Sequence, residues 1–422
     1  MRLDELKNKQ VVIFGWGREG KASYEVLIRQ GIKPIITDEQ IIDRQIIDHS
    51  DFLSFEKIDF SLATILLKSP GIPLKHPAVL KARLMGAIIT SATNIFFSER
   101  KGRGTIIGIT GTKGKSTTVA LTAAILETGT RRVVRAGNIG EPMLKYLDAP
   151  EETIFVLELS SYMLADLEIG PDISVILNVF EEHMDWHGSV AEYQAAKLNL
   201  IQIMTKDDLL IYAPECKPVL KALVGTAVQT KLMVALDQIP AKLLIRGEHN
   251  RENARAALSV ALELGIELEP ALEVIKNFKP LPHRLEEIMN ADDGGRIFVN
   301  DSISTTPQST LEAIKVYSDQ LRVIILGGFD RGYDFSVLVA ELIKRAEVLV
   351  LILPGGERLR AEFEVVGRFV KTVPDLAVAV AEARAVLGVN EVCLLSPAGP
   401  SYGQFKNFEE RGEKFRMAVE LV

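Results

Sequence analysis

The chain has 422 residues, with 49 basic and 56 acidic side chains and a formal net charge of −7. This length predicts roughly two or three domains, and 47% hydrophobic with 25% charged residues excludes a disordered, collagen-like or coiled-coil chain. An acidic chain without a basic block is a poor ligand for nucleic acid or an anionic membrane. The cysteines, Cys216 and Cys393, lie far apart and do not form a disulfide scaffold. With no apolar signal segment and no stretch long enough to span a bilayer, we expect a cytoplasmic protein.

The first segment follows the order strand, glycine turn, helix, strand, acid. A strand begins at Gln10, the turn occupies 15–20, a helical run covers 21–30, and a second strand ends in Asp38. This order is typical of dinucleotide-binding units, because the glycines permit a tight turn and the helix N-terminus attracts a phosphate. A strand–turn–helix unit without a ligand is the alternative.

The unit is too short for a complete dinucleotide domain. It continues with a strand at 63–69 and a helix near 77–85, and it ends near Ala92. That is only about half of the doubly wound pattern, so the unit suits a nucleoside diphosphate better than NAD or FAD. The Ser-Pro-Gly turn at 69–71 is a second candidate phosphate-facing turn, although an ordinary turn explains its composition equally well.

The strongest motif lies at 105–118, where a buried-strand run breaks into a glycine loop and a helix follows. Backbone N–H groups at 111–116 can converge on phosphate oxygens, Lys115 can neutralise their charge, and the Ser116 hydroxyl can ligate Mg²⁺. The first glycine of the usual pattern is replaced by Ile109, so the loop is a variant. We therefore predict that the chain binds ATP or GTP.

Two ionisable side chains follow in largely apolar segments. Glu158 ends a buried-strand run, where a carboxylate is costly unless it is paired or bound to a metal. It suits a second Mg²⁺ ligand, with an ion pair or a cap as the alternative. Lys197 lies in the apolar stripe of a helix over 191–203. Periodicity alone favours a lysine whose ammonium group extends to solvent.

An acid- and histidine-rich turn follows a strand that we expect to end in Asn178. His183 and His187 have the spacing of a helical zinc pair, but Met184 occupies the place where zinc peptidases need glutamate. The pattern therefore disfavours zinc hydrolysis.

The last third of the chain again alternates strands with helices. Strands are expected at 295–302, 321–328, 347–355 and 391–397, and Pro307 opens a helix after the first of them. Strands that alternate with helical patterns predict a second doubly wound α/β unit.

Several segments together carry a resemblance to a known family. They are ITGTKGKST, GNIG at 137–140, LELSSY, ILNVFEEHMDWHGS with YQAAK, GEHNREN, LPHRLE, NDS and LLSP with QFKNFEERG. They occur in the order found in the Mur ligase family, which the chain resembles over essentially its whole length. The phosphate loop is shared with the wider superfamily, which includes folylpolyglutamate synthase. GNIG, the Ser-Pro-Gly turn and the tail favour the branch that joins D-glutamate to UDP-N-acetylmuramoyl-L-alanine.

The resemblance implies an α/β protein with three domains and an ATP-dependent, amide-forming ligase activity in peptidoglycan synthesis. A short Rossmann-like domain at 1–92 is expected to bind the UDP substrate, a central P-loop ATPase-type domain at 93–280 to bind ATP, and a Rossmann-like domain at 281–422 to bring the amino acid. In this family the substrate carboxylate becomes an acyl phosphate that an amine then attacks. The protein mainly positions the reactants and spreads charge.

The resemblance also implies roles for individual residues. The expected catalytic residues are Lys115, His183 and Lys197, the last as a carbamate. Residues expected to bind ATP are Gly111, Thr112, Lys113, Gly114, Lys115, Ser116, Thr117, Asn253, Arg284 and Asp301. Residues expected to hold two Mg²⁺ ions are Ser116, Glu158, His183 and Lys197. Residues expected to contact the sugar nucleotide or glutamate are Arg18, Glu19, Asp38, Ser69, Pro70, Gly71, Asn138, Ser161, Thr305, Arg331, Ser401 and Phe408.

Three positions depart from the family pattern. Ile303 stands where many members have lysine, Arg331 replaces another lysine, and Lys113 replaces the usual asparagine of the phosphate loop. The loss of a cation at Ile303 makes a sister ligase that uses L-glutamate or another acidic amino acid the alternative. No D-N-P-R-like segment is present, which counts against the relatives that add diaminopimelate or lysine. A nucleotide-regulated switch without ligase activity is the more distant alternative. We expect a monomer whose partners are its substrates, without nucleic acid or membrane insertion.

Overall fold

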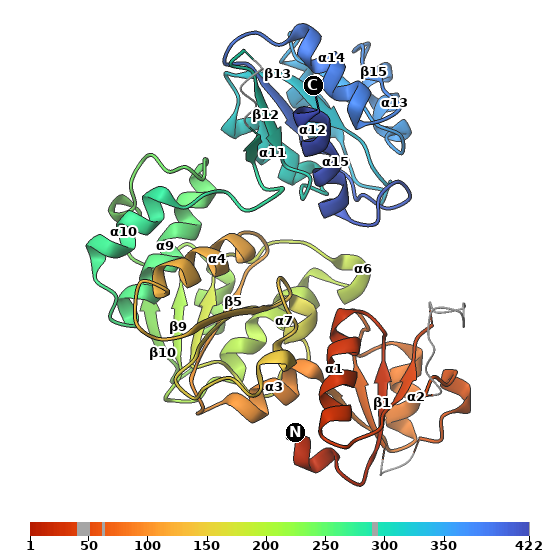
Figure 1. The fold of residues 1–422 in the computed structure, drawn as a ribbon, viewed down its shortest axis with the longest axis vertical. Coiled ribbons are helices and arrows are strands. Elements are labelled where there is room, and N and C mark those ends of the chain that lie inside the picture. Colours follow the sequence, from red (N-terminus) through yellow and green to blue (C-terminus); the bar gives the residue numbers. More distant parts are fainter. Residues whose placement is uncertain (40–50, 61–63, 289–293, 422) are drawn as a thin grey trace. The chain divides into compact units, whose positions relative to one another are not determined.

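The computed structural model describes residues 1–39, 51–60, 64–288 and 294–421. Within these residues the strands form three sheets of four, six and six strands. The chain divides into two compact units, Met1–Ala241 with His249–Asn277, and Lys242–Glu248 with Phe278–Val422. The first two sheets lie in the first unit and the third in the second (Figure 1). The predicted α/β class is confirmed.

The N-terminal sheet is parallel, with the strand order β2-β1-β3-β4. Its strands are β1 Gln10–Phe14, β2 Ile35–Thr37, β3 Thr64–Lys68 and β4 Ile88–Ser91. The accompanying helical elements are η1 Leu3–Leu6, α1 Arg18–Arg29, η2 Phe55–Lys57, α2 Pro77–Leu84 and α3 Ala92–Arg100. The first three strands and the helices α1 and α2 were predicted, whereas β4 and α3 were not. Four residues close to a glycine give β4 little periodicity. The Ser91 side chain ends β4 and caps α3 by accepting a hydrogen bond from the Asn94 N–H.

The central sheet is also parallel, with the order β10-β9-β8-β5-β7-β6. Its strands are β5 Thr105–Thr110, β6 Val133–Gly137, β7 Ile154–Glu158, β8 Ile173–Ile176, β9 Leu209–Tyr212 and β10 Gln229–Leu232. Its helical elements are α4 Lys115–Leu126, η3 Met143–Tyr146, α5 Ser161–Leu164, α6 Met184–His187, α7 Val190–Gln202, α8 Lys217–Ala222, η4 Leu236–Gln238, α9 Glu248–Glu263 and α10 Leu268–Asn277. The strand expected to reach Asn178 ends two residues earlier, which leaves that side chain in the loop.

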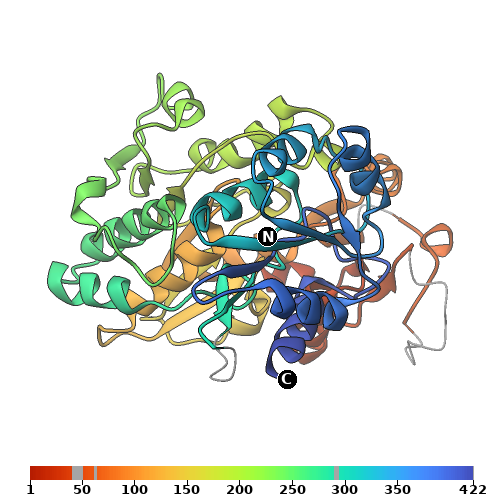
Figure 2. The same cartoon turned by 90° about the horizontal axis from the view of Figure 1, so that it is seen from above.

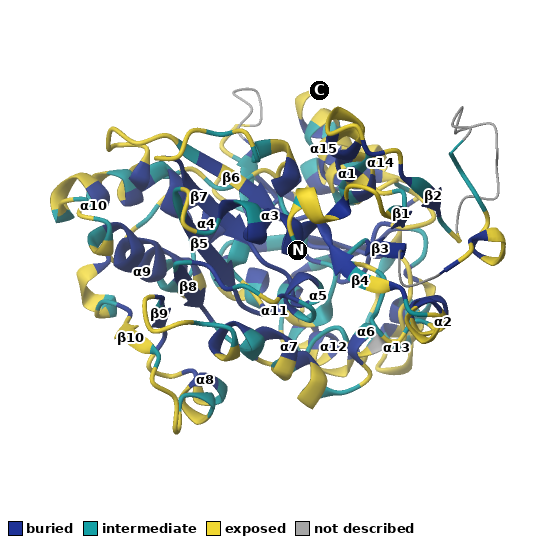
Figure 3. Ribbon diagram, turned by 90° about the horizontal axis from the view of Figure 1, so that it is seen from below, coloured by how far each residue is buried: buried dark blue, intermediate teal, exposed yellow. Residues whose placement is uncertain are grey.

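One hydrophobic cluster joins the first two sheets. It includes Ile13 and Val26 of the N-terminal segment, Phe96 of α3 and Ile107 of β5. Figure 3 shows β5, β7 and β8 in the colour of buried residues, whereas β10 at the sheet edge is exposed. Continuous apolar strands are typical of parallel sheets that are covered on both faces. The phosphate loop therefore starts from a rigid, fully buried strand.

The C-terminal sheet has the order β11-β12-β16-β13-β14-β15, in which only the β11–β12 pair is antiparallel. Its strands are β11 Glu286–Ile288, β12 Ile297–Asn300, β13 Leu321–Leu326, β14 Leu349–Ile352, β15 Lys371–Thr372 and β16 Val392–Leu395. Its helices are α11 Pro307–Val316, α12 Ser336–Ile343, α13 Glu357–Val365, α14 Leu376–Val386 and α15 Phe408–Glu420.

Helices cover both faces of this third sheet (Figure 2). Val299 packs in one cluster with side chains of α11, α12 and α13, whereas Phe298 packs in another with side chains of α14 and α15. Neighbouring strand residues point to opposite faces, so two separate cores result. The expected doubly wound unit is confirmed.

Candidate active site

The phosphate loop connects β5 to α4 in a conformation that requires glycine. Gly114, the residue before α4, has φ +89°, and a Cβ on it would lie 2.1 Å from the Asn253 Oδ1 atom. A side chain is therefore excluded both by backbone conformation and by space. Ser116 and Thr117 lie in the first turn of α4 and are buried. A glycine loop that leads into the N-terminus of a helix is a typical arrangement for anion binding.

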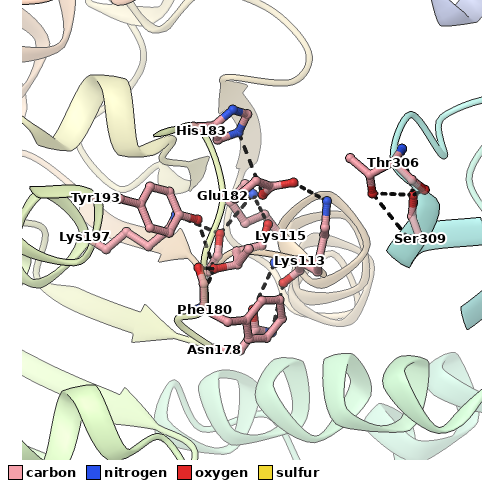
Figure 4. A network of polar contacts seen from close by, with 12 residues as sticks. Lys113, Lys115, Asn178, Phe180, Glu182, His183, Tyr193, Lys197, Thr306 and Ser309 are labelled. Carbon is pink, nitrogen blue, oxygen red and sulfur yellow. Dashed lines mark hydrogen bonds and ion pairs between the residues drawn. The ribbon is translucent and has the colours of Figure 1, made fainter. Parts of the chain in front are cut away.

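Asn178 holds the loop from the other side. Its Oδ1 atom accepts a hydrogen bond from the Lys113 N–H at 2.9 Å, and its Nδ2 atom donates to the Lys113 carbonyl at 3.1 Å. The hydroxyl of Tyr193 donates to Thr112 Oγ1 at 2.9 Å (Figure 4). The side chain of Lys113 pairs with Glu182. The loop is thus held in shape by side chains from two later segments.

Two lysines meet at one carbonyl of the loop. Lys115 Nζ donates to the carbonyls of Gly111 and Thr112 at 3.0 Å each, and Lys197 Nζ donates to the Gly111 carbonyl at 2.9 Å. Lys197 lies over the Tyr193 ring and is only 1% exposed, so the expectation that it extends to solvent is wrong. Burial, followed by the nearby charge of Lys115, holds the pKa of Lys197 well below its usual range.

Glu158 ends β7 beside the strand that leads into the loop, paired in register with Ile109. Its side chain is 2% exposed, and its Oε1 atom accepts a hydrogen bond from Asn138 Nδ2 at 2.8 Å. Among the described residues, no partner donates to its buried Oε2 atom. A buried carboxylate oxygen without a donor suits a cation. With the Ser116 hydroxyl, the oxygen ligands that Mg²⁺ prefers are present.

The two histidines of the turn make separate contacts. His183, which has φ +56°, shares a hydrogen bond of 2.9 Å between its Nδ1 atom and the Tyr162 hydroxyl. His187 is buried and shares one of 3.0 Å between Nε2 and the Ser161 Oγ atom. In the described part of the chain no three His, Cys, Asp or Glu residues form a group able to hold a metal. Among these residues, the structure therefore offers no support for a zinc site at the two histidines.

Asn253 of α9 lies directly beside the loop. It is buried, its Oδ1 atom accepts from the Thr118 hydroxyl at 3.3 Å, and its Nδ2 atom donates to Asn250 at 3.0 Å. This contact to the first turn of α4 places it where a nucleotide bound at the loop would be within reach.

The expected sugar-nucleotide residues come from two turns at the carboxyl edge of the first sheet. Asp38 accepts a hydrogen bond from the Trp16 N–H at 2.6 Å, and Ser69 Oγ donates to the Gly15 carbonyl at 3.0 Å. The structure therefore brings the glycine turn and the 69–71 turn together, as parallel strand ends require. Pro70 is the central residue of the second turn.

Two charged residues lie at the start of α1. The Arg18 guanidinium donates to the carbonyls of Asn138 and Gly140 at 3.2 and 3.1 Å, so it holds the GNIG segment. Burial raises the pKa of Glu19 to about 7, against the opposing charge of Arg18. Glu19 is therefore largely neutral below this pH.

The expected residues of the second unit lie around the ends of β12 and β16. Asp301 follows β12 and is buried, and its carboxylate accepts from Ser396 Oγ at 2.9 Å and from the Leu285 N–H at 3.3 Å. Burial raises the pKa of Asp301 to about 6. Arg284 lies in the turn just before Leu285, and its N–H donates to the Leu281 carbonyl at 3.1 Å.

The residues expected near glutamate occupy different local positions. Thr305 precedes Thr306, the N-cap of α11. The Arg331 guanidinium lies over the Tyr402 ring at 5.5 Å. Ser401 is buried. The carbonyl of Phe408, the first residue of α15, accepts a hydrogen bond from Ser302 Oγ at 2.8 Å.

Sequence reasoning missed the residues that support these positions. Arg411 is 1% exposed and donates to Ser302 and to the Gly399 carbonyl at 2.8 to 3.0 Å, and burial lowers its pKa to about 10. Asn178, Tyr162 and Tyr193 were also not assigned a role. Their place in the conspicuous LSSY, ILNV and YQAAK segments was the only available signal.

The fold and site define an α/β protein with three sheets and a glycine-rich phosphate loop between β5 and α4. Residues 109–230 match the family description "Mur ligase middle domain". The chain is 34% identical to UDP-N-acetylmuramoyl-L-alanine--L-glutamate ligase of a Micromonospora species, with 99% of this chain and 98% of that relative covered. It is 33% identical to UDP-N-acetylmuramoylalanine--D-glutamate ligase of Aquifex aeolicus, with 97% and 98% covered.

The solved structure of UDP-N-acetylmuramate-alanine ligase MurC from Thermotoga maritima has a similar fold. The TM-score is 0.59 at 17% identity, over 97% of this chain and 98% of that chain. The chain belongs to the Mur ligase family. Among the described residues, no helix is both long and apolar enough to cross a membrane.

Proposed function

We propose that the chain is an ATP-dependent ligase that joins D-glutamate to UDP-N-acetylmuramoyl-L-alanine. The observation that carries the proposal is the phosphate loop with buried Glu158 and Lys197 beside it, in a chain one-third identical to glutamate-adding ligases over nearly its full length. We assign the sugar nucleotide to residues 1–92, ATP to 93–280 and glutamate to 281–422. We further propose a monomeric, cytoplasmic enzyme.

The proposed reaction activates a carboxylate and then aminates it. An oxygen of the alanyl carboxylate forms a bond to the γ-phosphorus as the bond to ADP breaks. The glutamate amine then attacks the acyl carbon, loses a proton, and orthophosphate leaves. The loop N–H groups and Lys115 bind the phosphates and spread the charge that develops during transfer. Mg²⁺, held by Ser116, Glu158 and His183, would supply further charge neutralisation.

Lys197 is proposed to act as a carbamate. A neutral amine is needed to attack CO₂, and the lowered pKa of Lys197 favours this form. The reaction forms an N–C bond and releases one proton. The product keeps one N–H, which can continue to donate to the Gly111 carbonyl. The new carboxylate would offer oxygen to a cation beside Glu158.

For glutamate, the proposed contacts are Thr305, Arg331, Ser401 and Phe408. An arginine can bind a carboxylate through two parallel hydrogen bonds, which a lysine cannot do. Arg331 is therefore our candidate for the contact to the side-chain carboxylate, in place of the family lysine that Ile303 replaces.

Product identification tests the function. The chain is incubated with ATP, Mg²⁺, UDP-N-acetylmuramoyl-L-alanine and single amino acids, while orthophosphate and product mass are followed. We expect glutamate-dependent phosphate release and a product heavier by one glutamyl residue. Phosphate release that is equally fast without any amino acid, with no heavier product, contradicts the proposal and favours a nucleotide switch.

The L isomer of glutamate is the second candidate. It is favoured by the names of several relatives at 32 to 34% identity and by Ile303. The D isomer is the one in the name of the Aquifex aeolicus relative, which is 33% identical over 97% of this chain. Comparing kcat/KM for the two enantiomers decides between them.

A further inference from the structure

The 69–71 turn of the N-terminal sheet is held at both ends by the central segment. On one side, Lys68 Nζ forms an ion pair with Asp166 Oδ2 at 2.9 Å, and the Lys68 side chain is fully buried. On the other side, the Trp186 indole N–H donates to the Gly71 carbonyl at 2.8 Å. The second contact comes from a residue beside a proposed metal ligand, because the Trp186 backbone N–H donates to the His183 carbonyl at 3.2 Å.

The indole also belongs to an aromatic cluster. The Trp186 ring lies 4.7 Å from that of Tyr162 and 4.5 Å from that of His187, measured between ring centroids. The Tyr162 hydroxyl in turn shares a hydrogen bond with His183 Nδ1. A continuous set of contacts therefore runs from the Gly71 carbonyl through Trp186 and Tyr162 to His183.

The contacts at the two ends of the turn differ in rigidity. A buried ion pair is rigid, because separating it leaves an uncompensated charge. The Trp186 contact is a single hydrogen bond to a backbone carbonyl from a partly buried ring. A Cβ on Gly71 would meet no atom within 4 Å, so this side of the turn is open. We therefore expect a change in the turn to act on the Trp186 end rather than on the Lys68 end.

We propose that Trp186 is a positioning residue that couples the sugar-nucleotide turn to His183. When the substrate occupies the 69–71 turn, the Gly71 carbonyl fixes the orientation of the Trp186 indole. The indole and Tyr162 then fix the orientation of the His183 imidazole ring. This inference rests on the proposed function, since it takes the 69–71 turn as part of the sugar-nucleotide site and His183 as a metal ligand.

Fluorescence tests the first half of the coupling. The chain has two tryptophans, Trp16 and Trp186, so Trp16→Phe leaves Trp186 as the sole reporter. We expect its emission to change with added UDP-N-acetylmuramoyl-L-alanine and to saturate at the concentration at which calorimetry shows binding. The Trp16→Phe, Trp186→Phe double variant shows whether the signal belongs to the indole. Unchanged emission at calorimetric saturation overturns the proposal.

Kinetics tests the second half. Trp186→Phe keeps an aromatic ring but removes the N–H donor. We expect kcat to fall about 3- to 10-fold and the Mg²⁺ concentration for half-maximal rate to rise. The KM for the sugar nucleotide should change less. The control is Phe369→Leu, which removes an exposed aromatic ring of the second unit. A rise in sugar-nucleotide KM alone, with kcat and Mg²⁺ dependence unchanged, overturns the coupling and leaves Trp186 as a local substrate contact.

The unaltered chain distinguishes the two levels of failure. If it neither binds the sugar nucleotide in calorimetry nor forms a peptide product, both the proposed function and this inference are wrong. If the unaltered chain binds the sugar nucleotide and forms the product, only the coupling is wrong when Trp186 emission stays unchanged or when Trp186→Phe raises the sugar-nucleotide KM alone.

Discussion

Two glycine turns in this protein share the order strand, turn, helix but differ in the charged side chains at the start of the helix. In both, a parallel strand leads into a glycine-containing turn, and the N-cap residue of the following helix is a glycine, Gly17 or Gly114. The first turn of α1 carries both Arg18 and the acid Glu19, whereas α4 begins with Lys115 and has no acid in its first turn. A helix N-terminus attracts phosphate in either case. The side chains beside it decide how much phosphate charge each turn can hold.

The difference agrees with the ligands proposed for the two turns. A triphosphate that transfers its terminal group needs cations throughout the reaction. A UDP group that is only bound can be held by backbone N–H groups and polar turns. The acid at the N-terminal turn should make binding sensitive to pH. Five experiments test the two turns and the residues beside them.

Removal of the loop lysine should have the largest effect. Lys115→Ala is expected to lower kcat about 100- to 1000-fold, because the charge of the transferring phosphoryl group loses its cation. Calorimetric affinity for the sugar nucleotide should stay unchanged, since that ligand belongs to the other turn. Lys113→Ala is the matched control, with a fall below about 10-fold, because that exposed ammonium group pairs with Glu182. Equal losses of kcat in Lys115→Ala and Lys113→Ala would contradict the special role of Lys115.

Lys197 should show the next largest effect. Lys197→Ala is expected to lose activity about 100-fold, with partial recovery when a short carboxylic acid is supplied in place of the carbamate. Full activity of the plain alanine variant would exclude a catalytic carbamate.

The stability of the protein should also report the charge state of Lys197. Its folded pKa lies below the unfolded value of 10.5, so between the two values the unfolded chain binds more protons. Stability should therefore rise with pH through this window, and the cost of charging the buried amine is fully present below it. The measurement is the free energy of unfolding by denaturant as a function of pH in CO₂-free buffer. The unaltered chain should show the rise with pH, and Lys197→Met should not. Parallel slopes would mean that Lys197 has an ordinary pKa.

A paired glycine substitution tests the geometry of the N-terminal turn. A Cβ on Gly20 would lie 2.0 Å from the Gly15 carbonyl oxygen, whereas one on Gly17 would meet no atom within 4 Å. Gly20→Ala should destabilise the fold by about 1 to 3 kcal/mol and weaken sugar-nucleotide binding. Gly17→Ala should leave the melting temperature unchanged. Similar melting temperatures for both variants would show that the helix does not need this close approach.

The smallest expected effect is a pH dependence of sugar-nucleotide affinity. The pKa of Glu19 is about 7, so the side chain becomes an anion as pH rises through this value and repels a diphosphate. Affinity should therefore fall a few-fold between about pH 6 and pH 8, and Glu19→Gln should flatten the profile. The affinity for ADP at the central loop is the comparison, and its pH dependence should be the same in the unaltered chain and in Glu19→Gln. A profile that is unchanged in Glu19→Gln would place the carboxylate away from the ligand.

Much of this molecule could be predicted because several of its strands are apolar runs of five or six residues. Strands β1, β3, β5, β7 and β13 all have this character, and Pro307 marks the start of α11 correctly. The short β4 and the polar, exposed β10 were missed because they lack such a pattern. Asn178 was recognised as the end of a strand, but its bonds to Lys113 depend on a neighbouring strand far away in sequence.

The amino-acid sequence alone determined the α/β class, the phosphate loop and the family, because these depend on local spacing and on residue order. Only the tertiary structure decided the state of Lys197, since helical periodicity places it on an apolar stripe but does not reveal the Gly111 carbonyl and Tyr193 ring that enclose it. The same holds for the contact between Trp186 and Gly71, which joins α6 to the turn after β3. Burial and long-range contacts set pKa values and ring positions, and neither is encoded in the spacing of residues along one segment.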